Sequence, residues 1–224
     1  MKRTVLVSLC GLLFILLAAC SGKKQDQSSS SQTTPAVQNA PAPTAAAQFK
    51  KYDIKSGIAT FERVMSAGTM KLTNKVVVTF DDYGNKECKD EYVGDVLKTS
   101  NFTDGVKLYV TMYDKKTTFR RGDAFRGTEY RIAWDEISDA DKKSGVAKQV
   151  SGLQIAGKNC DGYVVTHDKD KTTYAGWGHV CLLLDSETGT THMIQKAVKF
   201  EENPVIDPSK FAAPAGFEIK DSPF

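Results

Sequence analysis

The sequence predicts a mainly β domain of the α+β type: a curled antiparallel sheet or half-open β-barrel with one or two short helices. Apolar and polar residues alternate along several segments, which is the period of a strand with one wet face. Turn-forming residues separate these segments at short intervals. The chain is also long enough for its sheet to curl or close, which protects the sheet edges.

The strand with the clearest pattern runs from residue 70 to residue 80. One of its faces is apolar and carries Met70, Leu72, Val76, Val78 and Phe80. The other face carries Lys71, Thr73, Lys75 and Thr79. Residues 52–64 alternate in the same way, and Gly68 between the two segments suits a hairpin. Residues 81–85 predict a turn, and residues 86–93 predict the return strand.

The middle of the domain predicts a meander followed by a short helix. Residues 94–105 are expected to form a loop, and residues 106–113, 117–121 and 125–132 are expected to form strands. Trp134, Ile137 and Ala140 recur at helical spacing, with acidic residues before Lys142 and Lys143. Gly145 is expected to end this helix.

The last third of the chain predicts further strands. These are residues 153–155, 162–167, 172–184, 191–202 and 217–219, with a hairpin turn at 168–171 and one helical turn at 207–211. The segment 191–202 fits both the strand and the helix period, and its strand neighbours favour a strand.

The first residues have the features of a secretory signal. Lys2 and Arg3 precede an uncharged run, residues 5–19, that is too short for a stable membrane span. Leu17-Ala18-Ala19-Cys20 then resembles the lipobox of bacterial lipoproteins. This resemblance implies a lipid on the Cys20 thiol, cleavage before Cys20, and acylation of the new amino terminus, for example with palmitate. The alternative is a plain secretory signal in which Cys20 occurs by chance.

The organisation that follows is a lipoprotein signal peptide at 1–19, a lipidated cysteine with a disordered linker at 20–47, and a β domain at 48–224. The linker is rich in Ser, Thr, Pro and Ala and has too few bulky apolar residues to fold. In well-studied Gram-negative lipoproteins, Asp after the cysteine retains the protein at the inner membrane. Ser21 therefore favours the outer membrane of the bacterial envelope.

Charge and motifs exclude several functions. Four of the 30 basic and one of the 27 acidic residues precede residue 48, so the domain carries 26 of each and has no footprint for nucleic acid. The segment 152–158 resembles a P-loop, but Asn159 replaces the required Ser or Thr. We therefore interpret Gly157 and Lys158 as a hairpin turn. No Gly-x-Ser-x-Gly motif occurs. His167, His179 and His192 do not have the ligand spacing of a zinc site. We expect no enzyme, cofactor or metal.

The cysteines leave one pairing open. Cys160 and Cys181 flank the predicted hairpin and could form a disulfide if Asp170 and Lys171 are its turn residues. If the turn lies one residue earlier, the two side chains are diagonal and about 7–8 Å apart, which is too far. Cys88 is expected to be a small buried apolar residue.

A basic cluster surrounds one turn of the meander: Lys115, Lys116, Arg120, Arg121 and Arg126. We interpret it as a solvated edge that blocks the addition of further strands. The alternative is a surface for anionic lipid headgroups.

Four segments carry a family resemblance: residues 52–58, 80–87, 156–163 and 211–217. With the strand pattern, they resemble bacterial envelope lipoproteins of unassigned function and, more distantly, the LolA/LolB lipoprotein carriers. That resemblance implies a half-open barrel with short helices at its mouth and an apolar cavity for acyl chains. The inward residues would be Val76, Val78, Phe80, Leu108, Val110 and Met112. The alternative is that these residues fill a packed core.

The sequence therefore predicts a non-enzymatic lipoprotein, anchored to the membrane through Cys20, that binds a lipid or the acyl chains of another lipoprotein. The alternative is a non-catalytic envelope scaffold, or a surface interaction module, with a packed core.

Overall fold

The computed structural model describes residues 50–123 and 130–222. The signal, Cys20 and the linker lie outside the described residues, as do Arg126 and most of the predicted strand 125–132. Only the β domain is considered below. Within its described part, no helix is long and apolar enough to cross a membrane.

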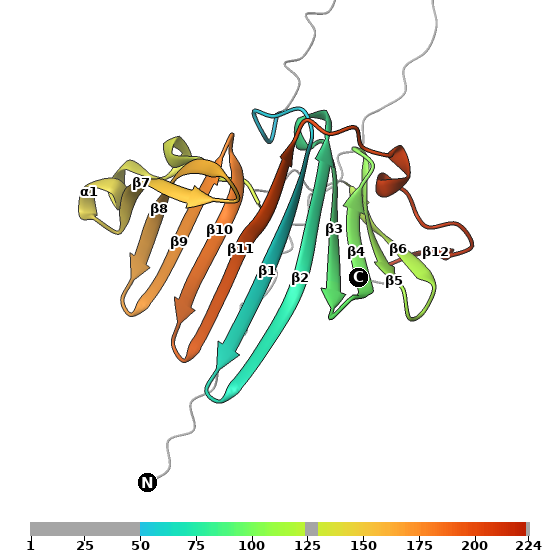
Figure 1. The fold of residues 1–224 in the computed structure, drawn as a ribbon, viewed down its shortest axis with the longest axis horizontal. Coiled ribbons are helices and arrows are strands. Elements are labelled where there is room, and N and C mark those ends of the chain that lie inside the picture. Colours follow the sequence, from blue (N-terminus) through green and yellow to red (C-terminus); the bar gives the residue numbers. More distant parts are fainter. Residues whose placement is uncertain (1–49, 124–129, 223–224) are drawn as a thin grey trace, which may run out of the picture. The chain divides into compact units, whose positions relative to one another are not determined.

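Twelve strands form one curled sheet that does not close (Figure 1). They are β1 (Gly57–Ala67), β2 (Met70–Asp81), β3 (Lys86–Val93), β4 (Val96–Thr103), β5 (Lys107–Met112), β6 (Thr117–Asp123), β7 (Ala147–Ile155), β8 (Lys158–His167), β9 (Asp170–Trp177), β10 (Val180–Thr188), β11 (Thr191–Glu202) and β12 (Glu218–Asp221). The helical pieces are η1 (Asp82–Gly84), η2 (Trp134–Glu136), α1 (Asp139–Ser144) and η3 (Pro208–Phe211). The predicted fold class is confirmed.

The order of strands across the sheet is β12-β6-β5-β4-β3-β2-β1-β11-β10-β9-β8-β7. All neighbours are antiparallel except β12, which runs parallel to β6. The central strand β1 pairs with β2 on one side and with β11, from the far end of the chain, on the other. Figure 1 shows the β1–β2, β3–β4, β8–β9 and β10–β11 hairpins at one end of the sheet.

Tight turns build these hairpins where glycine permits a positive φ. Gly68 has φ +58° in the β1–β2 turn, as the sequence predicted. Ile155 pairs with Lys158, so Ala156 and Gly157 form the two-residue turn between β7 and β8 with φ of 48° and 78°. These values fit a hairpin turn of type I′. The hairpin expected at Gly157 and Lys158 is confirmed, but its turn lies one residue earlier and Lys158 begins β8.

Two predicted elements are wrong. Residues 94–105, expected as a loop, contain β4, because Gly94 and Asp95 form a two-residue turn after Val93. Residues 172–184, expected as one strand, belong to β9 and β10. The chain turns between them at Gly178 and His179, both of which have positive φ.

The predicted helix over 134–143 is confirmed only in part. It forms as the short 3₁₀ turn η2 and then as α1. Ser138 caps α1 by accepting a hydrogen bond from the Asp141 N–H, and Gly145 ends it with φ +77°.

The main core packs against β1, β2 and β8–β11. Its largest fully buried side chains include Tyr52, Phe61, Phe80 and Leu182. Backbone hydrogen bonds hold Tyr52 in this core. The N–H groups of Lys51 and Tyr52 donate to the Tyr83 carbonyl, and the Asp53 N–H donates to the Gly178 carbonyl.

A second cluster, with Cys88, Phe102 and Phe211, lies on the opposite face of β3 and β4. Cys88 pairs with Thr79, whereas Val78 and Phe80 on either side of Thr79 belong to the main core, and successive strand residues point to opposite faces.

Candidate functional site

The six residues predicted to face inward do share one face of the sheet. Cross-strand pairing runs from Val78 of β2 to Lys89, then Asn101, then Val110 of β5. The rows on either side link Val76 with Met112 and Phe80 with Leu108 in the same way.

These six residues do not line one cavity, however. Val76, Val78 and Phe80 are at most 1% exposed and are packed into the main core. Leu108, Val110 and Met112 are only half-buried. Between the two groups, β3 and β4 place charged and polar side chains on the same face: Glu87, Lys89, Glu91, Thr99, Asn101 and Thr103. For the three β2 residues, the packed-core alternative is the one that the structure forms.

The same face becomes apolar and open towards the hairpin ends. Leu72 of β2 pairs with Met65 of β1, which pairs with Met193 of β11, so the three side chains are direct neighbours. Five of the large apolar side chains here are 39% to 73% exposed, and Met193 is half-buried. We call this set the apolar patch: Met65, Met70, Leu72, Val93, Val96 and Met193.

Register places each member of the apolar patch on one face. Met70 lies two residues before Leu72, and Val93 lies two residues after Glu91, whose carboxylate reaches Arg63 of β1. Val96 pairs with Val93 across the β3–β4 hairpin. Since side chains alternate along a strand, the patch continues the face that packs the core.

Arg63 separates the buried part of this face from the apolar patch. Its Nε donates to Gln195 Oε1 at 2.7 Å, its Nη1 to Glu91 Oε1 at 3.2 Å and its Nη2 to the Tyr130 hydroxyl at 3.4 Å. Tyr130 in turn contacts Phe61 of the core, with ring centroids 5.6 Å apart. The guanidinium thus joins three strands and the segment that begins at residue 130. Nothing in the local sequence around Arg63 indicates this role.

A buried carboxylate occupies the opposite face of the sheet, beside a cavity of about 490 Å³ between β3–β5 and residues 209–215. Asp90 is 3% exposed; its Oδ2 accepts from Lys210 Nζ at 2.8 Å, and its Oδ1 accepts from Ser100 Oγ and, at 3.4 Å, from Cys88 Sγ. Burial lowers the pKa of Lys210, but the hydrogen bond and charge of Asp90 outweigh it and leave this pKa raised. Lys210 therefore ties the C-terminal segment to the sheet.

Another cavity, of about 400 Å³, lies beside η2 and strands β8 and β9. Trp134, Tyr163 and Trp177 contribute aromatic rings to its wall, and Asp135 and Asp161 contribute exposed carboxylates. The cavity is polar and aromatic rather than apolar, so it does not have the lining expected for an acyl chain.

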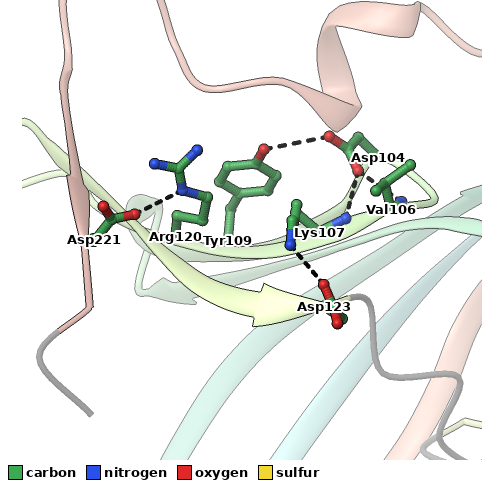
Figure 2. Close-up of polar contacts among 7 residues, drawn as sticks. All are labelled: Asp104, Val106, Lys107, Tyr109, Arg120, Asp123 and Asp221. Carbon is green, nitrogen blue, oxygen red and sulfur yellow. Dashed lines mark hydrogen bonds and ion pairs between the residues drawn. The ribbon is translucent and has the colours of Figure 1, made fainter. Parts of the chain in front are cut away.

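The outer edge of β6 is the third candidate. Figure 2 shows Arg120 reaching Asp221 of β12, with Nε to Oδ1 at 2.7 Å, and Lys107 reaching Asp123 at 2.6 Å. The prediction that the basic residues block strand addition is wrong here, because β12 adds to this edge and Arg120 binds its carboxylate. This hydrogen bond lowers the pKa of Asp221 and raises that of Arg120.

The possible disulfide between Cys160 and Cys181 does not form. His167 pairs with Asp170, so Asp168 and Lys169 are the turn residues and neither of the two registers considered occurs. Strand β9 also lies between Cys160 on β8 and Cys181 on β10.

Both cysteines are free thiols, and so is Cys88. Burial raises the pKa of Cys160 and raises that of Cys181 to about 12. Both therefore stay protonated and unreactive at neutral pH.

The histidines do not converge. His179 pairs with Asp53 at 3.2 Å and His192 with Asp185 at 2.7 Å, while His167 lies at the other end of β9 from His179. In residues 50–123 and 130–222, no group of three or more His, Cys, Asp or Glu side chains is placed to hold a metal ion.

No family model matches the chain, and no curated protein matches it closely. Several solved structures are similar to it. An uncharacterized conserved protein from Thermus thermophilus is 8% identical, with 75% of this chain and 91% of that chain covered and a TM-score of 0.49. The MucA/MucB complex of Pseudomonas aeruginosa is 10% identical over 74% of this chain and 58% of that chain, with a TM-score of 0.44.

A LolA superfamily protein from Nitrosomonas europaea is 9% identical, with 72% of this chain and 94% of that chain covered and a TM-score of 0.38. At these identities the likeness concerns the fold alone, so the site is argued from this chain's own residues.

Proposed function

We propose that this chain is a non-enzymatic lipoprotein of the bacterial envelope, anchored to the outer membrane through Cys20, that binds acyl chains of a lipid or of another lipoprotein. The observation that carries the proposal is the apolar patch, an open continuation of the core face. Contiguous exposed apolar surface marks a binding site more often than a chance arrangement.

The side chains of the patch suit a flexible apolar ligand. Three of its six members are methionines, which adapt to irregular apolar surfaces because the side chain is unbranched and polarisable. Arg63, Glu91 and Gln195 form a polar boundary at the inner end of the patch. An acyl chain lying across β2, β1 and β11 would therefore bury methylene groups on the patch, at about 0.8 kcal/mol for each one fully buried.

The test uses the full-length Cys20→Ser chain, which removes the predicted lipid of the protein itself. The chain is incubated with a photoreactive diacyl phospholipid, irradiated and measured by intact mass. We expect an adduct on this chain and on a Val106→Lys control, because Val106 is exposed but lies outside the patch. We expect loss of the adduct when Met65 or Leu72 is replaced by Lys.

Equal labelling of all four chains, or no labelling of any, would remove the support for acyl-chain binding. The second of these results would favour the alternative, an interaction module with a packed interior.

A further inference from the structure

Strand β12 is weakly attached at the end of the sheet. It has four residues, all of them exposed, and it is the one strand of the described sheet that pairs in parallel. Its ends are fixed by hydrogen bonds from the Glu218 N–H to the Lys116 carbonyl at 3.1 Å and from the Ser222 N–H to the Arg120 carbonyl at 2.8 Å. Short parallel pairing is less stable than antiparallel pairing.

Side chains add little to this attachment. The Arg120–Asp221 ion pair is exposed on both sides (Figure 2), and solvent screens such pairs so that they add little to stability. Ile219, the apolar residue of β12, is 56% exposed. The ring of Phe217, just before β12, makes an edge contact with Tyr113 at 5.4 Å between centroids. β12 can therefore leave the edge without uncovering the core.

The edge beneath β12 selects for an acidic extended segment. Lys115 and Lys116, just before β6, are exposed and make no ion pair within residues 50–123 and 130–222. Departure of β12 would also free backbone groups of β6, such as the carbonyls of Lys116 and Arg120, and an unpaired edge accepts another strand.

We propose that the outer edge of β6 is a strand-acceptor site for an extended acidic segment of a partner protein, and that β12 is its exchangeable internal occupant. The chain itself shows what fits: an aromatic residue at the position of Phe217 and a carboxylate at the position of Asp221. This site is separate from the apolar patch and does not depend on lipid binding.

The test measures binding of a fluorescent peptide with the sequence of residues 214–222, by anisotropy, in the Cys20→Ser background. We expect a chain that ends at Gly216 to bind the peptide, and the chain with β12 intact to bind it about tenfold more weakly. The attached strand competes at a high effective concentration.

Charge reversal then tests the register. Arg120→Glu in the shortened chain is expected to weaken binding about fivefold, the upper range for one exposed ion pair. A peptide carrying Asp221→Arg is expected to restore it. Arg121→Glu is the matched control, because it makes the same charge change at the next position of β6, which lies outside the β6–β12 register. An Arg121→Glu loss as large as that of Arg120→Glu would contradict the proposed register.

Hydrogen exchange on the intact chain provides a second, independent measurement. The amides of Glu218 and Ser222 are expected to exchange at least tenfold faster than the amides between β1 and β2. Equally slow exchange, or no peptide binding by a folded shortened chain, would overturn the proposal. A dimer of the intact chain that dissociates when the chain ends at Gly216 would assign the edge to a second copy and overturn a separate partner.

Discussion

At the scale of single residues, Glu87 is a partly buried carboxylate with two donors from the segment before β1. The Tyr52 hydroxyl donates to its Oε2 at 2.6 Å and Lys51 Nζ lies 2.8 Å from the same atom. Tyr52→Phe keeps the ring on Phe80 but removes one hydrogen bond to a charged group. We expect it to lower the free energy of unfolding by about 1.5–3 kcal/mol in urea titrations.

Tyr109→Phe is the control for this experiment, because its hydroxyl lies 3.3 Å from Asp104 Oδ2 on a half-buried surface. We expect it to cost less than about 1 kcal/mol. Equal losses of unfolding free energy in the two variants would show that the hydrogen bond between Tyr52 and Glu87 stabilises the fold no more than the one between Tyr109 and Asp104.

The ion pair between buried Asp90 and exposed Lys210 predicts a non-additive double substitution. Lys210→Met leaves the Asp90 carboxylate with little solvent and no counter-charge. We expect this variant to lower the free energy of unfolding by about 3 kcal/mol. Adding Asp90→Asn should recover at least half of that loss, since neither charge is then left alone. Chemical denaturation of the two single variants and the double variant measures this coupling. Additive losses would contradict it.

Stability should fall at alkaline pH because of groups that ionise only on unfolding. Burial raises the pKa of Cys181 from 9.0 to about 12 and that of Tyr163 from 10.0 to about 12. Above pH 9 the unfolded thiol has lost its proton while the folded thiol still binds it. The unfolded state therefore binds fewer protons, and the free energy of unfolding decreases as the pH rises from 9 towards 12.

The Cys181 contribution amounts to about 1.4 kcal/mol per pH unit within that window. We expect Cys181→Ala to show a shallower alkaline slope than the unsubstituted chain in pH-dependent thermal unfolding. An identical slope would show that Cys181 ionises equally easily in both states.

At the scale of elements, a close approach of two strands depends on Gly162. A Cβ at this position would lie 1.9 Å from the Tyr174 carbonyl oxygen of the neighbouring strand β9. We expect Gly162→Ala to lower the free energy of unfolding by about 3 kcal/mol, because the added Cβ forces β8 and β9 apart. Thermal and urea unfolding measure this change.

Gly94→Asn is its control. No atom lies within 4 Å of a Cβ at Gly94, and asparagine tolerates the φ of +58° found there. We expect this variant to change stability by less than about 1 kcal/mol. A larger effect at Gly94 than at Gly162 would contradict the argument from strand spacing.

Elements with strict alternation could be predicted from the sequence, and elements defined by contacts could not. The segment of β2 has one apolar and one polar face, so its limits were found to within one residue. β4 is mostly polar, and only its burial of Ser100 and Phe102 marks it as a strand. The turn between β9 and β10 uses His179 with φ +65°, a conformation that is uncommon for any residue other than glycine.

The candidate site, too, could be predicted only where it depends on strand alternation. The alternation of β2 identified Leu72 and Met70 as part of an apolar face, together with the residues that fill the core. It could not show where the core ends, because that limit is set by Arg63 and Gln195, which meet from positions 132 residues apart. The basic residues of β6 were found, but their role changed because the partner strand comes from the C-terminal end of the chain.

At the scale of the whole molecule, Cys20 predicts where the domain is held. Cys20→Ala should move the protein from the membrane fraction to the soluble fraction and abolish incorporation of labelled palmitate. Cys10→Ala, inside the predicted signal, changes another cysteine and should leave both properties unaltered. Retention of the Cys20→Ala chain in the membrane fraction would show that something other than a lipid on this residue anchors it.

The pairing of β1 with β11 has a consequence for the order in which the molecule folds. Phe61 pairs with Ala197, 136 positions later, so the central strand stays half-paired until nearly the whole chain has been made. Contacts of such sequence separation are costly to close and slow to form. For a chain with the predicted export signal, this delay keeps the polypeptide unfolded while it is synthesised and translocated. In such a chain the core would assemble only after the C-terminal strands had crossed the membrane.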